Sequence, residues 1–166
     1  MPTVPDMWRA ELWHPMVVHF PIALLLGAAV LRWIHLATGR NRFPVLYSCS
    51  KGMLVVGALF SWLAIYTGDI ADSIVTRALC DPTVLEAHEQ LAMWTAFLFT
   101  IAAILDLIHD YWKWNDWKGS FATWTVAILL LAGSAGLSYT AHLGASLVYQ
   151  QGAAVYHPTD GCTEFD

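Results

Sequence analysis

Four long apolar runs constrain this chain more than any other feature of its sequence. They cover Met16–Ala37, Gly52–Thr67, Ala87–Ile108 and Phe121–His142. A helix crosses the lipid core with about 20 mostly apolar residues, and charged residues avoid all four runs together. The charged share of the chain is 13% and its mean hydropathy is +0.51, whereas about 25% of the residues in soluble domains are charged. The pattern predicts an all-α membrane protein with four transmembrane helices in one domain, residues 1–166, and disfavours a soluble helical bundle.

The connections between the four runs are short. Short connections favour an antiparallel up-down bundle in which spans one and three are diagonal neighbours. Pro21 removes one backbone N–H near the start of span one, so we expect a bend there. The segment Leu143–Val155 is mildly amphipathic and too short to cross, which predicts a short interfacial helix after span four.

Small residues recur at a spacing of four in three of the spans. The pairs are Ala23 with Gly27, Gly57 with Ser61, and Ala132 with Gly136. Such stripes let helices approach closely in lipid, and they could also make room for a flat macrocycle.

The positive charges predict the orientation of the chain. Six of the eight Lys and Arg residues follow span one or span three, and two lie on the other side: Arg32, Arg40, Arg42, Lys51, Lys113 and Lys118 against Arg9 and Arg77. Because short cytoplasmic loops collect Lys and Arg, both termini are expected to face outward, which in a bacterial inner membrane is the periplasm.

Most acidic residues fall on the predicted outer side. They are Asp6, Glu11, Asp69, Asp72, Asp81, Glu86, Glu89, Asp160, Glu164 and Asp166. A negative outer surface suits a basic soluble partner and not a nucleic acid. Cys80 and Cys162 share this oxidising side, so they are a candidate disulfide.

Histidines gather at the same predicted face. His14 and His19 lie at the start of span one, His88 opens span three and His142 closes span four. Ionisable side chains at the edge of a lipid core are costly and are usually functional, and histidine is a common ligand of haem and metals. His19, His88 and His142 are expected at a similar depth, which favours His19 with either of the other two as ligands of one haem b, while His14 lies further out.

A second haem b would need histidines at the opposite face. His35 ends span one and His109 ends span three, so diagonal neighbours could bring them together there.

Several motifs resemble those of the bacterial membrane family catalogued as domain of unknown function 2231. They are HPMVVHFPIALLL at the start of span one, the TGD of Thr67–Asp69, the pair His88–Glu89, and HLGASLVYQQGAAV after Ala141. The resemblance covers nearly the whole chain and implies four spans and a set of outer histidines, here His14, His19, His88 and His142. Some members resemble haem-b-carrying respiratory partners. Ala145 and Gln151 depart from the family pattern, and Gln151 cannot ligate haem iron in the usual way.

These observations together predict a haem-b electron-transfer subunit of a respiratory or photosynthetic-type membrane complex. It would link the quinone pool to a periplasmic redox partner, with Asp69, Asp72 and Glu89 handling protons near a quinone. One alternative is a non-catalytic membrane anchor or accessory subunit. Another is a non-haem metal protein in which His19, His88 and His142 join carboxylates as ligands. No hydrolytic or nucleotide-binding motif is visible, so enzymatic activity is expected to go no further than electron transfer.

The charge bias generates a prediction about topology. A reporter that is active only outside the cytoplasm, fused after Asp166, is expected to be active. The same fusion carrying a reporter active only in the cytoplasm is expected to be silent. Activity of the cytoplasmic reporter would reverse the orientation.

Overall fold

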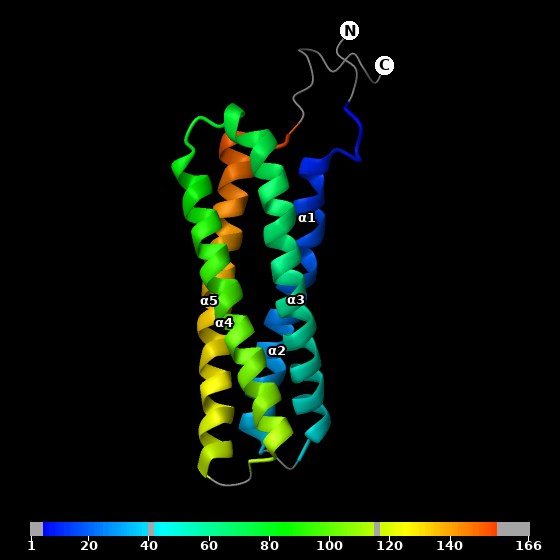
Figure 1. Ribbon diagram of the computed structural model, residues 1–166, viewed down its shortest axis with the longest axis vertical. Coiled ribbons are helices and arrows are strands. Elements are labelled where there is room, and N and C mark those ends of the chain that lie inside the picture. The colour runs from blue at the N-terminus through cyan, green and yellow to red at the C-terminus, as the bar shows by residue number, and fades with distance from the viewer. Residues whose placement is uncertain (1–4, 40–41, 115–116, 156–166) are drawn as a thin grey trace.

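The computed structural model describes residues 5–39, 42–114 and 117–155, and this part of the chain is built from helices (Figure 1). In chain order they are η1 (Ala10–Leu12), α1 (Trp13–Val17), α2 (His19–Thr38), α3 (Pro44–Val75), η2 (Thr76–Ala78), α4 (Thr83–Trp112) and α5 (Trp117–Gln151). Four stretches are long and apolar enough to cross a membrane: Ala10–Thr38, Pro44–Ala78, Thr83–Trp112 and Trp117–Gln151.

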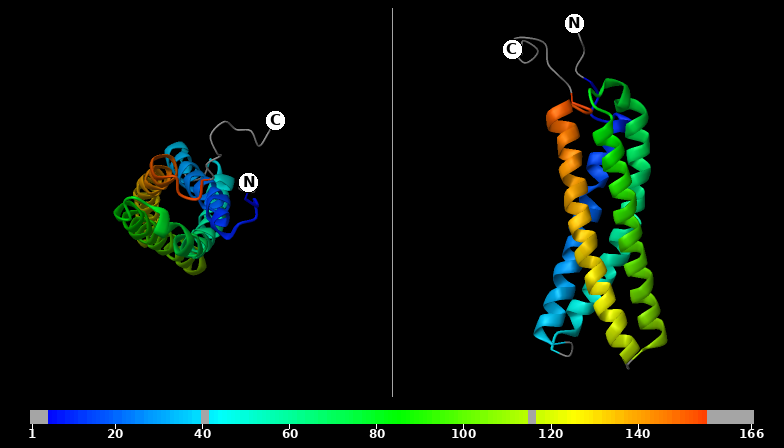
Figure 2. Two further views of the ribbon diagram at one scale, coloured as in Figure 1. Left: turned by 90° about the horizontal axis from the view of Figure 1, so that it is seen from above. Right: turned by 90° about the vertical axis from the view of Figure 1, so that its left-hand side faces the viewer.

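The helices form an antiparallel bundle that Figure 2 shows from above as a ring. Helix α2 packs on α3, α3 on α4, α4 on α5, and α5 on α2. Span one therefore lies diagonally opposite span three, and the predicted all-α four-helix bundle is confirmed. We call the end with α1 and the last turn of α5 the terminal end, and the end with the α2–α3 and α4–α5 connections the loop end.

Span one is interrupted near its start, where a bend was expected. Helix α1 ends at Val17 and α2 begins at His19. Pro21 has no N–H to donate to the Val17 carbonyl, but Ile22 N–H still reaches the Val18 carbonyl at 3.2 Å. The interruption divides the contacts of the span, because α1 packs on α3 whereas α2 packs on both α3 and α5.

Helix α5 is longer than the sequence predicted. The segment after span four was expected to form a separate interfacial helix, but residues 143–151 continue α5 without a break. Leu147 is buried, so this extension packs against the bundle. The helix ends where Gly152 and Ala154 take positive φ angles of 69° and 60°, a backbone conformation that stops a helix.

Asp81 joins the starts and ends of two helices at the terminal end. Its carboxylate accepts hydrogen bonds from the hydroxyl (2.6 Å) and the N–H (3.0 Å) of Thr83 in the first turn of α4. These bonds, the hydroxyl's foremost, hold the pKa of the Asp81 carboxyl below its ordinary value. The backbone N–H of Asp81 donates to Gln151 Oε1 at 2.9 Å. Gln151, where many relatives were expected to have histidine, therefore ties the end of α5 to the α3–α4 connection.

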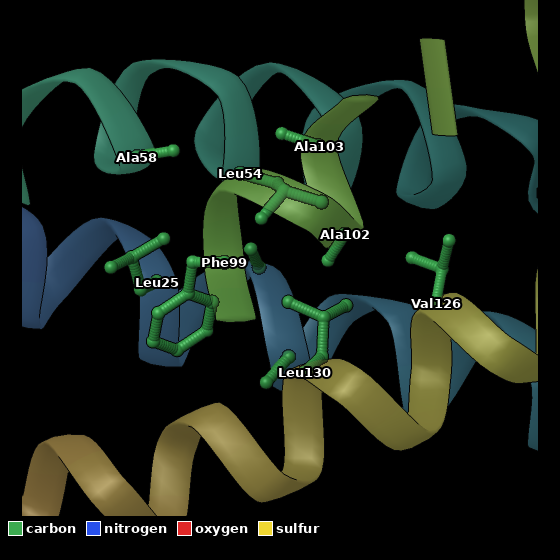
Figure 3. Close-up of a cluster of buried hydrophobic side chains, with 10 residues drawn as sticks. Leu25, Leu54, Ala58, Phe99, Ala102, Ala103, Val126 and Leu130 are labelled. Atoms are coloured by element: carbon green, nitrogen blue, oxygen red, sulfur yellow. The ribbon is translucent and has the colours of Figure 1, made fainter. Parts of the chain in front are cut away.

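The middle of the bundle is a dry apolar layer. Leu25, Leu54, Phe99 and Leu130 have no exposed surface and come from four different helices, and Figure 3 shows them pointing toward one another. A Cβ on Gly133 would lie 2.8 Å from the Phe99 ring. Glycine at such positions lets α5 approach α4, so these small residues serve packing.

A buried ion pair crosses the diagonal of the bundle near the loop end. Arg32 of α2 and Asp106 of α4 are 0% and 1% exposed, and the guanidinium donates to both carboxylate oxygens, at 3.1 and 2.5 Å. Arg32 Nε donates to Ser50 Oγ at 3.2 Å, and that hydroxyl donates to the Ala28 carbonyl at 2.8 Å. Arg32 is therefore not a loop charge, as its position in the sequence suggested, but an internal charge of span one.

The loss of one member of this pair is expected to cost far more stability than the loss of both. Asp106→Leu leaves the guanidinium buried without its counter-ion, at a cost of about 3–5 kcal/mol. The double variant Arg32→Met with Asp106→Leu removes both charges and is expected to recover most of that loss. Unfolding in mixed detergent micelles measures both, and equal losses in the single and double variants would contradict the assignment.

Candidate functional site

Two histidines face each other inside the terminal end. His14 comes from α1 and His88 from the second turn of α4, and both are half-buried. Their ring centroids are 6.1 Å apart, and the ring planes are nearly perpendicular at 88°. The two rings thus meet across the same diagonal that Arg32 and Asp106 bridge at the other end.

Each ring is fixed by a carbonyl of the next helix along the chain. His14 Nδ1 is 2.9 Å from the Ala64 carbonyl oxygen of α3, and His88 Nδ1 is 2.9 Å from the Thr140 carbonyl oxygen of α5. A carbonyl only accepts hydrogen bonds, so each Nδ1 carries the hydrogen. In a neutral imidazole this leaves Nε2 with a free lone pair, which is the form that binds a metal.

A glycine makes room for each ring. A Cβ on Gly68 would lie 3.3 Å from Cε1 and Nδ1 of His14, and a Cβ on Gly144 would lie 3.1 Å from Cε1 of His88. Each glycine follows its carbonyl residue by four positions, one turn along the same helix. A larger residue there would cover the carbonyl that holds the ring.

The two hairpins α1–α2–α3 and α4–α5 therefore repeat one unit: a histidine, a carbonyl and a glycine. The sequence shows no obvious repeat, but one spacing marks it. His14 and Arg32 are 18 residues apart, and so are His88 and Asp106. Eighteen residues are five full helical turns, so an unbroken helix would present both members of each pair on one face.

The other two histidines of the predicted site lie elsewhere. His19 and His142 are exposed, and the His142 ring stacks on Tyr139 of its own helix at 6.2 Å. Depth along a continuous helix favoured His19 as a partner of His88, but the chain is interrupted at Val18. The interruption leaves His14 facing inward, so the structure pairs His88 with His14.

The three carboxylates predicted to handle protons surround the terminal end of the site. Asp69 directly follows Gly68, and Glu89 directly follows His88; both are exposed, and Asp72 is half-buried. Glu89 interacts electrostatically with Asp72 and Asp69. The histidine pair thus lies beside a concentration of negative charge.

The donors around the pair suit a haem more than a multi-ligand metal ion. Within residues 5–39, 42–114 and 117–155, no group of three or more His, Cys, Asp or Glu side chains could hold a metal ion. Haem iron needs only two axial ligands. Iron bound at about 2.0 Å to each Nε2 would separate the ring centroids by about 6 Å, close to the distance between His14 and His88.

The cysteine pair stays a prediction. Cys80 is exposed with a free thiol, and Cys162 lies outside the described residues, as does His157 of the tail.

Sequence analysis missed a second polar cluster, which lies at the loop end. Tyr47 of α3 donates its hydroxyl hydrogen to Asp106 at 3.2 Å, and its oxygen is 3.4 Å from His109 Nδ1. The Tyr47 ring lies 4.8 Å below the Arg32 guanidinium and 5.7 Å from the ring of His35. Both histidines considered for a second haem thus contact Tyr47, and that haem stays a prediction.

The comparisons with known proteins assign the chain to a family. The family model described as "Predicted membrane protein (DUF2231)" matches residues 12–157, so the chain belongs to this family, as its motifs indicated. No curated protein and no solved structure matches it significantly.

The glycine beside His88 generates a prediction. Gly144→Val is expected to push the ring away from the Thr140 carbonyl and to destabilise the bundle by about 1–3 kcal/mol, as overpacking does. Gly52→Val is the matched control, because a Cβ there meets nothing within 4 Å. Thermal unfolding in detergent compares them, and equal midpoints would contradict the close contact.

Proposed function

We propose that this DUF2231 member binds one haem b between His14 and His88 and works as an electron-transfer subunit of a membrane complex. The observation that carries the proposal is the facing pair of imidazoles, 6.1 Å apart at the centroids, each with Nδ1 held by a backbone carbonyl. When bound, haem b supplies a one-electron redox centre. The protein's part is to present two neutral Nε2 lone pairs at fixed positions.

In this proposal the terminal end faces the periplasm of a bacterial inner membrane, as the Lys and Arg bias favours. Electrons pass between the quinone pool and a periplasmic redox partner. Asp69, Asp72 and Glu89 are the groups proposed to exchange protons with quinone, because they are the carboxylates next to the histidines. Their negative charge favours a basic partner.

A non-catalytic accessory subunit is the second candidate, and one observation favours it. Each Nδ1 hydrogen bond ties a helix to the next helix of its hairpin. The same contacts would therefore fasten the bundle in a protein that holds no cofactor.

Absorbance spectra of protein made in a haem-replete host test the proposal. The wild type is expected to show a low-spin haem b, oxidised and then reduced. His14→Ala and His88→Ala are each expected to abolish the low-spin spectrum. His19→Ala and His142→Ala are the matched controls, since both side chains are exposed, and they are expected to keep it.

Two results would contradict this assignment. Loss of the spectrum in His19→Ala with its survival in His14→Ala would restore the pair that depth alone suggested. Wild-type protein without haem would leave the accessory subunit.

The carboxylates near the pair generate a further prediction. Glu89→Gln removes a negative charge that stabilises the oxidised, more positive centre, so the reduction potential of the bound haem is expected to rise by some tens of millivolts, on the order of a Coulomb term across a partly solvated site. Asp110→Asn at the loop end is the control and is expected to leave the potential unchanged. A potential that falls or stays constant in Glu89→Gln would show that the carboxylate does not act on the site.

A further inference from the structure

The proposed haem site leaves the loop-end cluster without a role, although the cluster contains the most deeply buried charges of the molecule. Arg32, Ser50 and Asp106 each lie six residues inside the loop end of their helices, about 9 Å along the axis. Ionisable groups at this depth in a membrane helix are costly and usually carry a function.

A chain of hydrogen bonds leads from Asp106 toward the loop end. Tyr47 has one hydroxyl hydrogen, and it points to Asp106 Oδ1 at 3.2 Å. Its oxygen can therefore accept from His109 Nδ1–H at 3.4 Å. His109 is half-buried, and its Nε2 lies at the first turns of α5, where a Cβ on Gly119 would be 3.2 Å away.

The chain of polar groups stops at the ion pair. Beyond Asp106, toward the terminal end, lie Leu54, Phe99 and Leu130, all fully buried and apolar. Such a layer offers a proton no acceptor, so Asp106 is reached from one side only.

We propose that Asp106 is a proton-binding site that exchanges with the loop-end solution through His109 and Tyr47. A proton from water binds Nε2 of neutral His109. The Nδ1–H bond then breaks as a new O–H bond forms on Tyr47, and the original hydroxyl proton of Tyr47 passes to Asp106 Oδ1. His109 returns to its neutral form, Tyr47 stays a phenol, and Asp106 becomes a neutral acid.

The charged groups around the site set its preference. Arg32 from α2 favours the ionised carboxylate. From α3, Lys51 lies over the Tyr47 ring at 5.6 Å and pairs with Asp110 of α4 at 2.6 Å. His35 of α2, whose buried Nδ1 has no hydrogen-bond partner among the described residues, adds an acceptor near Tyr47, and α5 places Lys118 next to Gly119. Protonation of Asp106 removes the counter-ion of Arg32, so proton uptake loosens the bridge between spans one and three.

Infrared difference spectroscopy of the full chain in lipid nanodiscs tests the relay. With aspartate carboxyls labelled by carbon-13, a protonated-carboxyl band is expected to grow as the pH falls and to be absent in Asp106→Asn. In pH-jump experiments Tyr47→Phe keeps the ring under Arg32 but lacks the hydroxyl. Its band is expected to appear more slowly by about tenfold or more, since a positioned proton donor typically contributes at least that much.

Tyr111→Phe is the matched control, because Tyr111 is 80% exposed at the same end, and its rate is expected to equal that of the wild type. An equal rate in Tyr47→Phe would overturn the relay. The absence of any buried-aspartate band at every pH at which the protein stays helical would overturn the proton site, leaving the ion pair a purely structural bridge. Neither result depends on whether haem is bound.

Discussion

The ion pair between Arg32 and Asp106 is the constraint on which the arrangement of the bundle depends. Two full charges in a lipid-facing bundle are tolerable only when they meet and when their remaining hydrogen-bond capacity is satisfied. Ser50 completes the guanidinium, and Tyr47 completes the carboxylate. Because apolar side chains slide past one another in lipid with little penalty, this pair fixes how far span one is shifted along span three.

The histidine pair inherits that register. His14 and His88 each precede a member of the ion pair by 18 residues, so fixing the heights of Arg32 and Asp106 places the two imidazoles at similar heights at the other end. The carbonyls of Ala64 and Thr140 then set the ring orientations. Register comes from charge and orientation comes from the backbone, and both are needed before two Nε2 atoms can share one ligand.

The architecture was predictable from the sequence because length and apolarity decide it locally. Four runs near 20 residues allow little besides four spanning helices, and short connections fix their order around the ring. The family was likewise legible in contiguous motifs such as that around His14 and His19. The continuation of α5 was not predictable, because an amphipathic segment such as that around Leu147 packs equally well on a lipid interface or on a neighbouring helix.

Parts of the candidate site lay beyond sequence reasoning for a related reason. Choosing His14 over His19 requires the rotation introduced at Val18, which a helical count cannot supply. Arg32 was read as a loop charge because its partner, Asp106, is 74 residues away. Only the equal spacing of the two His–charge pairs hinted that Asp106 and Arg32 belong together.

The dry layer around Phe99 also determines where a transmembrane voltage acts. An electric potential falls mainly across the region of lowest polarisability, and here that region is the apolar layer between the histidine pair and the ion pair. A full charge carried across the whole membrane changes its energy by about 2.3 kcal/mol per 100 mV. Charges that arrive at either cluster from their own side traverse only a small part of that drop, so the membrane voltage has little hold on either one, while the layer itself insulates the two from each other.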